Sequence, residues 1–156
     1  MLNRNPYKLA PKSEHISDVL HLIRKSFAYM EGRIDPPSSM HRLTKQSISE
    51  HCVKEEVWCI GEPPIACIFF TVKEDCLYVG KLAVEDIAKG QGVARELMDL
   101  ASRRAKELGF RALELQVRVE LTENQAVFKK MGFVKTGEDA HEGYDRPTSY
   151  TMRKSI

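Results

Sequence analysis

Two glycines stand one residue apart in the segment Lys89–Ala94, KGQGVA, where the pattern of apolar residues changes. The apolar run before it, Cys76–Val84, reads as a strand, and the apolar residues after it, from Val93 to Leu108, recur at helical spacing. A glycine loop between a strand and a helix leaves the free N–H groups of the helix N-terminus uncovered by side chains. These groups and the helix dipole favour an anion, so the loop predicts a site for a phosphate group such as a pyrophosphate.

The loop does not match two common phosphate-binding motifs. A P-loop ends in Gly-Lys-Ser or Gly-Lys-Thr, whereas this loop ends in Gly-Val-Ala. A dinucleotide-binding fingerprint needs a glycine or alanine three residues after Gly92, where Arg95 stands. The nature of the phosphate ligand therefore has to be inferred from the rest of the chain.

The predicted strand before the loop changes phase. Leu77 and Val79 alternate on one face, but after Gly80–Lys81 the apolar residues Leu82 and Val84 continue with the opposite parity. A slip of one residue at a glycine predicts a β-bulge, and a strand buried on both faces is the alternative interpretation.

The apolar and turn residues elsewhere predict the elements that position the loop. In the first half we expect a strand at Tyr7–Ala10, a helix of about four turns capped by Ser13 and running from Ile16 to Met30, a helix at Thr44–Cys52, and a hairpin of Glu56–Ile60 and Ile65–Val72. In the second half we expect the helix after the loop to end at Gly109 and a strand to follow at Arg111–Val119. A capping box of Thr122 and Gln125 predicts the start of another helix, which ends near Met131. The last strands are expected at Phe133–Thr136 and Ser149–Arg153. This order is typical of an α/β or α+β fold with a right-handed crossover at its centre.

Length, charge and cysteine spacing exclude several classes of protein. A chain of 156 residues with 42% hydrophobic and 29% charged residues suits a single globular domain, residues 1–156. The formal net charge of +2 is too small for a nucleic-acid-binding surface, and no apolar run is long enough to span a membrane. The four cysteines lack zinc-ligand spacing, and Cys59 and Cys67 lie in apolar runs, so we expect free thiols and no metal. The first residues lack the apolar core of a signal peptide, which predicts a cytoplasmic protein.

Two segments resemble the signatures of one family. Lys89–Ala94 is similar to the Arg/Gln-x-x-Gly-x-Gly/Ala signature of the GNAT superfamily of N-acetyltransferases. Leu121–Phe133, LTENQAVFKKMGF, resembles the second signature, an Asn-containing turn that leads to a Tyr-x-x-x-Gly-Phe helix end. The resemblance implies a GNAT-type α/β (α+β) fold, with a central mixed, largely antiparallel sheet splayed open at the cofactor site and helices on both faces.

The resemblance also implies acetyl-coenzyme A as the acyl donor, with no metal. Backbone groups of the bulged strand would pair with the pantetheine arm, N–H groups of the glycine loop would take the pyrophosphate, and a lysine would reach phosphate oxygens. The cofactor-binding residues implied in this way are Leu82, Ala83, Val84, Lys89, Gly90, Gln91, Gly92, Val93, Ala94, Arg95, Asn124, Phe128 and Lys130.

The chain departs from the family pattern at two positions. Lys89 replaces the usual Arg or Gln, which keeps a charge but loses the planar fork of arginine. Phe128 stands where many members carry a Tyr thought to protonate the departing thiolate, and a phenyl ring cannot act as an acid. Tyr144, Tyr150 or a water molecule would have to supply that proton, unless the thiolate leaves unaided.

Two polar loops, Glu31–Arg42 and His141–Pro147, each contain an Arg, an Asp and a Pro. The resemblance implies that the acceptor pocket lies between them, and the alternative is that Asp-Pro and Arg-Pro turns only shape the loops. The candidates for contacting the acceptor amine or relaying its proton are Asp35, His41, His141, Tyr144 and Asp145, among which Tyr144, His141 and Asp35 are the predicted catalytic residues.

The sequence thus predicts an N-acetyltransferase in which a primary amine attacks acetyl-coenzyme A directly in a ternary complex. The alternative is a non-catalytic acyl-coenzyme A-binding sensor or regulatory module. The acceptor would be a small-molecule amine or a protein or peptide amine, with no nucleic-acid or membrane partner. A homodimer, common in the superfamily, is neither indicated nor excluded by the sequence.

Overall fold

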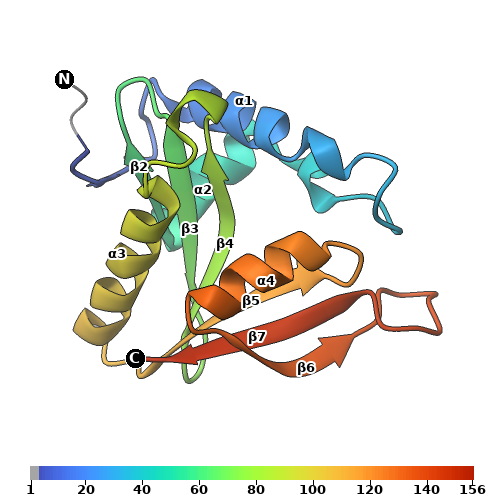
Figure 1. Cartoon of the computed structure of the whole chain (residues 1–156). Coiled ribbons are helices and arrows are strands. Elements are labelled where there is room, and N and C mark those ends of the chain that lie inside the picture. Colours follow the sequence, from blue (N-terminus) through green and yellow to red (C-terminus); the bar gives the residue numbers. More distant parts are fainter. Residues whose placement is uncertain (1–3) are drawn as a thin grey trace.

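The computed structural model of the chain describes residues 4–156. Its strands are β1 (Tyr7–Lys8), β2 (Glu56–Ile60), β3 (Ala66–Val72), β4 (Leu77–Val84), β5 (Ala112–Arg118), β6 (Val134–Asp139) and β7 (Ser149–Ser155). Within the described residues they form one seven-stranded sheet in the order β1-β2-β3-β4-β5-β7-β6 (Figure 1). Neighbouring strands are antiparallel except β4 and β5, which are parallel. The predicted mixed, largely antiparallel sheet is confirmed.

The sheet is open between β4 and β5. In the described chain these strands pair only where both begin, Leu77 with Leu113 and Tyr78 with Glu114. From there the two strands diverge, and Figure 1 shows their arrows pointing in different directions. The C-terminal ends of β4 and β5 are therefore the two tips of an open wedge.

The phase slip predicted in β4 is a β-bulge. Phe69 of β3 pairs with Gly80 and Cys67 pairs with Ala83, so two residues of β4 face the single residue between them on β3. Lys81, inside the bulge, has a φ of +49°, a left-handed value that is uncommon for a residue with a side chain. Burial on both faces is the wrong interpretation, because five of the eight β4 residues are only partly buried.

Within residues 4–156, four α-helices cover the two faces of the sheet. They are α1 (Ile16–Ser26), α2 (Lys45–Lys54), α3 (Val93–Glu107) and α4 (Thr122–Lys130). Successive residues of a strand face opposite sides. Cys67 and Phe69 of β3 join an apolar cluster with α1 and α2, whereas Ala66, Ile68 and Phe70 join a second cluster with α3 and α4. The predicted arrangement of helices on both faces is confirmed (Figure 1).

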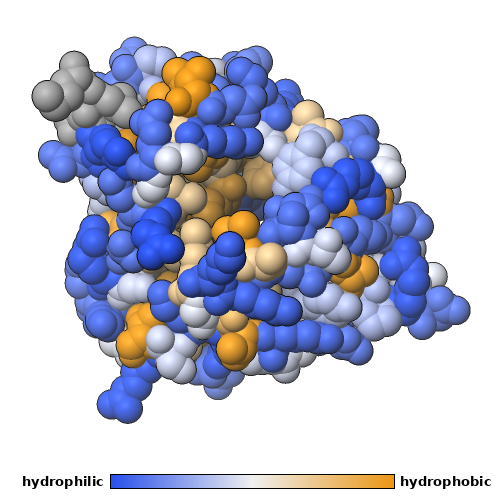
Figure 2. Space-filling model, viewed as in Figure 1, coloured by the Kyte–Doolittle hydropathy of each residue, from blue (hydrophilic) through white to orange (hydrophobic). Residues whose placement is uncertain are grey.

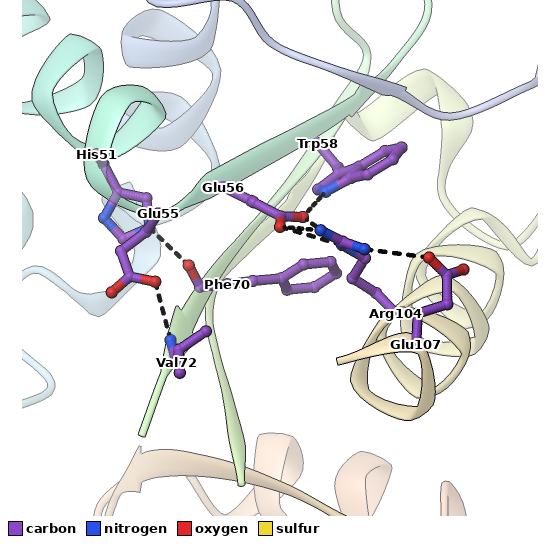
Figure 3. Close-up of polar contacts among 8 residues, drawn as sticks. All are labelled: His51, Glu55, Glu56, Trp58, Phe70, Val72, Arg104 and Glu107. Carbon is purple, nitrogen blue, oxygen red and sulfur yellow. Dashed lines mark hydrogen bonds and ion pairs between the residues drawn. The ribbon is translucent and has the colours of Figure 1, made fainter. Parts of the chain in front are cut away.

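An ion pair fastens α3 to the sheet (Figure 3). Arg104 donates from Nε and Nη2 to the carboxylate of Glu56 in β2, at 2.9 and 2.7 Å, and the Trp58 indole donates to the same carboxylate at 2.8 Å. Burial alone would raise the pKa of Glu56, but these donors outweigh it and hold the pKa below its ordinary value. Against the other face, His51 of α2 contacts the carbonyl oxygen of Phe70 at 2.9 Å. These contacts hold α2 and α3 against opposite faces of the sheet.

The first helix is shorter than predicted. α1 ends at Ser26, and Ala28–Met30 forms a separate 3-10 helix, η1. The predicted cap is also wrong, because the N-cap is His15 and no side chain caps it. The Ser13 hydroxyl instead accepts a hydrogen bond from the backbone N–H of His15 at 3.0 Å, a local contact that shapes the turn before the helix.

The predicted capping box of α4 does not form. Thr122 is the first helical residue, and Leu121, whose side chain is buried, is the N-cap. The Gln125 amide instead donates to the backbone carbonyls of Arg118 and Val119, at 3.2 and 3.0 Å. Burial of Leu121 sets where the helix begins, and Gln125 then joins the start of α4 to the end of β5.

The remaining elements lie close to their predicted bounds. The hairpin of β2 and β3 begins one residue later than expected in its second strand, and β6 continues three residues farther, to Asp139. All four cysteines are free and buried, which confirms the prediction made for Cys59 and Cys67.

Candidate functional site

A cavity of about 1220 Å³ lies where β4 and β5 separate. Its walls come from β4, the glycine loop, the start of α3, the end of β5, α4, and the two polar loops. Figure 2 shows the recess at the centre of the molecule, with apolar residues inside and polar residues around the rim. Such a cleft suits a ligand with a long, mostly apolar arm and polar ends.

The glycine loop adopts backbone angles that favour glycine. Gly90 and Gly92 have φ values of +79° and +78°. Gly92 is the N-cap of α3, and no side chain caps the first turn of that helix. Both glycines line the cavity together with Val93, Ala94 and Arg95. The loop therefore presents backbone N–H groups and a helix N-terminus to the cavity, an arrangement that fits a phosphate group.

Gln91, the remaining residue of the loop, is exposed and does not line the cavity. Its side chain donates to the carbonyl of Ile87 at 3.1 Å, and its own carbonyl accepts from Arg4 Nη2 at 2.8 Å. Arg4 also forms an ion pair with Glu96 of α3 at 2.7 Å. Arg4 thus holds the glycine loop from outside the cavity. No sequence motif predicts this role, because the partners of Arg4 lie 87 and 92 positions farther along the chain.

The bulged half of β4 forms one wall of the cavity. Leu82, Ala83 and Val84 line it. Beyond Tyr78, no described residue of β4 pairs with β5. Backbone groups on this edge are therefore available to a ligand that carries amides, in the manner of an added strand.

α4 forms the opposite wall. Phe128 lines the cavity and packs edge-on against Phe133, with ring centroids 6.1 Å apart. Asn124 also lines the cavity, and its amide donates to the hydroxyl of Tyr29 at 2.8 Å. This part of the wall is mostly apolar, and the Phe128 ring has no proton to donate.

The two lysines predicted to reach a phosphate differ in position. Lys89 lines the cavity, and its Nζ lies 3.0 Å from a carboxylate oxygen of Asp86. Lys130 is exposed on α4 and is not part of the cavity wall. A phosphate contact for Lys130 remains a prediction that its position does not favour.

The two polar loops meet at the other end of the cavity. The Tyr144 hydroxyl donates to Asp35 Oδ1 at 2.5 Å, and Arg146 Nη2 donates to the Asp35 backbone carbonyl at 3.3 Å. The hydrogen bond to Asp35 is the main reason that the pKa of Tyr144 is raised. Residues 109 positions apart in sequence are therefore in direct contact, and of the two Tyr144 lines the cavity whereas Asp35 is exposed and is not part of its wall.

The ring of His141 is held between two partners. Its Nδ1 contacts the hydroxyl of Thr148, a completely buried residue, and its Nε2 lies 3.1 Å from Nη1 of Arg118. A guanidinium can only donate, so Nε2 accepts and the proton of the neutral ring sits on Nδ1. Burial first and the Arg118 charge second lower the pKa of His141, which favours this neutral form.

The other candidates are placed less favourably. His41 lines the cavity, with its Nε2 3.4 Å from the Glu31 carboxylate, whereas Asp145 does not line the cavity. The sequence analysis missed Thr148 and Arg118. Arg118 occupies a polar position in the alternating strand RALELQVRV. This position predicts that Arg118 faces away from the core, but it does not predict what Arg118 contacts.

Residues 4–156 contain neither a metal-binding cluster nor a membrane-spanning helix. Among these residues, no three His, Cys, Asp or Glu side chains are grouped as metal ligands. No helix in this part of the chain combines the length and the apolar character needed to cross a membrane.

Known proteins resemble this chain in sequence and in fold. Residues 16–133 match the model of the acetyltransferase (GNAT) family. An IAA acetyltransferase of Azospirillum brasilense is 26% identical over 140 residues, which cover 88% of this chain and 90% of the relative. The PaiA N-acetyltransferase of Thermoplasma acidophilum, solved in complex with coenzyme A, has a TM-score of 0.80 at 14% identity over 97% of this chain and 98% of its own. A GNAT family acetyltransferase of Elizabethkingia anophelis with acetyl-CoA bound has a TM-score of 0.69 at 14% identity over 99% of both chains.

Proposed function

Because the chain belongs to the acetyltransferase (GNAT) family, we propose that it transfers an acetyl group from acetyl-coenzyme A to a primary amine. The observation that carries this proposal is the single cavity that joins the glycine loop to the two polar loops. Direct transfer requires both substrates in one space, with the amine held against the reacting carbon.

The residues at the glycine-loop end fit the coenzyme A part of the donor. Backbone N–H groups from Gly92 to Arg95 bind the pyrophosphate, where the dipole of α3 contributes about 0.3–1 kcal/mol per favourable charge contact. Leu82, Ala83 and Val84 hold the pantetheine arm through their backbone groups. Solved relatives of the same fold carry coenzyme A or acetyl-CoA, which supports this choice of cofactor.

When bound, acetyl-coenzyme A supplies a thioester, from which the amine takes the acetyl group as a C–N bond forms and the C–S bond breaks. Backbone N–H groups of β4 polarise the carbonyl as negative charge develops on its oxygen. No covalent intermediate on the enzyme is needed. Burial raises the pKa of the Cys59 and Cys67 thiols, so neither is a ready nucleophile.

The acceptor amine attacks in its neutral form and must lose a proton. In this proposal the Asp35 carboxylate takes that proton, directly or through water, while the Tyr144 hydroxyl holds the carboxylate in place. His141 already accepts a hydrogen bond from Arg118, so it first serves to position the loop. Its Nε2 can take a proton only after that contact breaks.

The departing thiolate does not depend on an acid at Phe128. A thiol with a pKa of about 8.5 is only about 1.5 units above neutral pH. Solvent can therefore protonate the thiolate after it leaves, at a modest cost in rate. The Tyr144 hydroxyl is a poor substitute as an acid, because its raised pKa favours retention of its proton.

The second candidate function is a non-catalytic acyl-coenzyme A-binding sensor or regulatory module. Phe128 is the observation that favours it, because this residue removes the acid that many family members use. The sensor would keep the cofactor-binding features and lack amine-dependent turnover.

A thiol-release assay separates the two functions. Purified protein is mixed with acetyl-coenzyme A and a panel of polyamines, aminoglycosides, amino acids and peptides with free N-termini, and free thiol is followed with a chromogenic reagent. We expect release that depends on the amine, and mass spectrometry should find the acetylated acceptor. Tight binding of coenzyme A without amine-dependent release would favour the sensor.

We further propose that residues 1–156 form a single domain, that the protein is cytoplasmic, and that it has no nucleic-acid or membrane partner. Four free, buried thiols fit a reducing compartment and support the location. A homodimer is left to a measurement of mass in solution.

A further inference from the structure

The guanidinium of Arg118 is incompletely paired. Arg118 is the last residue of β5, and it lines the cavity. Its Nη1 donates to His141 Nε2 at 3.1 Å. Its Nε and Nη2 are both shielded from solvent and have no hydrogen-bond partner. A buried donor normally has a partner, and a buried charge almost always does, so these two atoms need an explanation.

Neighbouring charges of the protein do not provide that partner. The ion pairs of this region, within residues 4–156, join Arg33 to Glu123 and Arg146 to Asp35, and neither includes Arg118. The nearby Glu120 uses Oε2 to accept the backbone N–H of Asp35 at 3.0 Å, and its buried Oε1, like the two guanidinium nitrogens, has no hydrogen-bond partner. Burial is the main influence on Arg118 and lowers its pKa, while the surrounding carboxylates oppose this shift without touching the guanidinium.

The unpaired atoms form the edge of a guanidinium that matches a carboxylate. Two parallel N–H bonds from Nε and Nη2 fit the two oxygens of a carboxylate group. Arg104 of the same chain shows this geometry, because its Nε and Nη2 hold the Glu56 carboxylate. Arg118 lines the ligand cavity, the same edge of its guanidinium is shielded from solvent, and no protein carboxylate is bound to it.

The position of Arg118 assigns it to the acceptor end of the cavity. β4 leads from Val84 toward the glycine loop, whereas β5 ends at Arg118, and the two strands diverge after Tyr78 and Glu114. Arg118 and the glycine loop therefore lie on opposite sides of the gap between β4 and β5. Arg118 is also in contact with His141, in the loop whose Tyr144 meets Asp35.

We propose that Arg118 binds a carboxylate of the acyl acceptor through Nε and Nη2, so that the acceptor is an amino acid or another small amine that carries a carboxylate. This inference rests on the proposed acetyl transfer. Because both nitrogen atoms are shielded, the side chains packed around Arg118, His141 among them, shift when the carboxylate enters. Arg118 is then a residue that determines specificity, while the reacting amine lies toward Asp35.

Matched acceptors test the inference on the wild-type protein. Each common amino acid is compared with its amide, which keeps the side chain and the amine but lacks the carboxylate. The amine of the amide is the less basic of the two, so its larger neutral fraction works against the expected result. We expect kcat/KM for the best amino acid to exceed that of its amide by about tenfold or more, because the amide leaves the guanidinium unpaired.

Substitution of Arg118 should remove this preference. In R118Q we expect the ratio of acid to amide to fall to about one, mainly through a higher KM for the acid, with the KM for acetyl-coenzyme A unchanged. R118K should keep part of the preference, since it retains the charge and loses the fork. R103Q is the matched control, because Arg103 is an exposed arginine of α3 outside the cavity wall, and it should behave as wild type.

Calorimetric titration gives a readout that does not depend on turnover. The wild-type protein saturated with coenzyme A should bind the amino acid at least about tenfold more tightly than the amide, and this measurement also decides the case if R118Q fails to fold. Equal binding, equal losses for acid and amide in R118Q, or a raised KM for acetyl-coenzyme A alone would overturn the inference.

The outcomes also separate this inference from the proposed function. Turnover of polyamines or amides, with no preference for a carboxylate, would leave acetyl transfer standing and overturn the role of Arg118. Carboxylate binding that depends on Arg118, without thiol release for any amine, would support the anion site and contradict acetyl transfer.

Discussion

The two ends of the cavity are built in different ways. At the donor end, the glycine loop and the bulged strand β4 present backbone groups, and the residues involved are close together in sequence. At the acceptor end, side chains from segments more than 100 positions apart contact one another, as Tyr144 and Asp35 do. One end is defined mainly by chain conformation and the other mainly by side-chain chemistry.

This difference fits the demands on each end. A cofactor shared by many relatives can be held by backbone N–H groups and a helix dipole, which most side-chain substitutions leave in place. An acceptor that differs between relatives has to be recognised by exchangeable side chains on loops. If the comparison is correct, substitutions at the two ends should separate donor binding from acceptor use.

The largest effect is expected when the backbone of the donor end is changed. Gly92→Ala places a Cβ on a residue with a φ of +78°, which costs about 1–2 kcal/mol in the left-handed region or forces the loop to change. We expect the Kd for coenzyme A to rise by about tenfold or more, as measured by calorimetry, because the N–H groups lose their alignment.

Gly109→Ala is the matched control for this change. Gly109 follows the other end of the same helix, has a φ of +88°, and an added Cβ there also meets no atom within 4 Å. Both variants should lose similar thermal stability, but Gly109→Ala should keep wild-type affinity for coenzyme A. Equal affinities in the two variants would contradict the assignment of the glycine loop.

A smaller effect is expected from a side chain at the acceptor end. Tyr144→Phe removes the hydroxyl that donates to Asp35 at 2.5 Å, while the ring remains. We expect kcat/KM for the acceptor to fall by about fivefold, because the carboxylate is no longer held in place. The Kd for coenzyme A should stay within about twofold of wild type, and a change there instead would break the division between the two ends.

The smallest effect is expected from a side chain at the donor end. Lys89→Ala removes an exposed ammonium that is paired with Asp86, and such exposed pairs contribute little. We expect the Kd for coenzyme A to rise by about twofold, much less than in Gly92→Ala. Lys106→Ala, an exposed lysine near the other end of α3, serves as the charge-matched control. A large loss in Lys89→Ala alone would show that side-chain charge, and not the backbone, holds the phosphate.

Sequence reasoning recovered most of the fold because the patterns it used are local. The alternation in β5, the helical spacing in α3 and the phase slip at Gly80 each depend on residues within one element, and each is present in the structure. The errors occurred where a tertiary contact competes with a local motif. Gln125 does not form the predicted capping box, because its side-chain amide donates instead to the backbone carbonyls of Arg118 and Val119.

The sequence by itself determined the strand, glycine loop and helix, because glycine spacing and apolar periodicity act over a few residues. It also predicted the donor, through two signature segments that resemble one family. Only the tertiary structure decided the acceptor end. Arg118 is the last residue of β5, whereas His141 and Thr148 lie in the loop between β6 and β7, and nothing in their spacing shows that one ring would join them. Packing of the loops against the end of β5 brings them together and leaves two guanidinium nitrogens without a partner, the feature on which the proposed choice of acceptor rests.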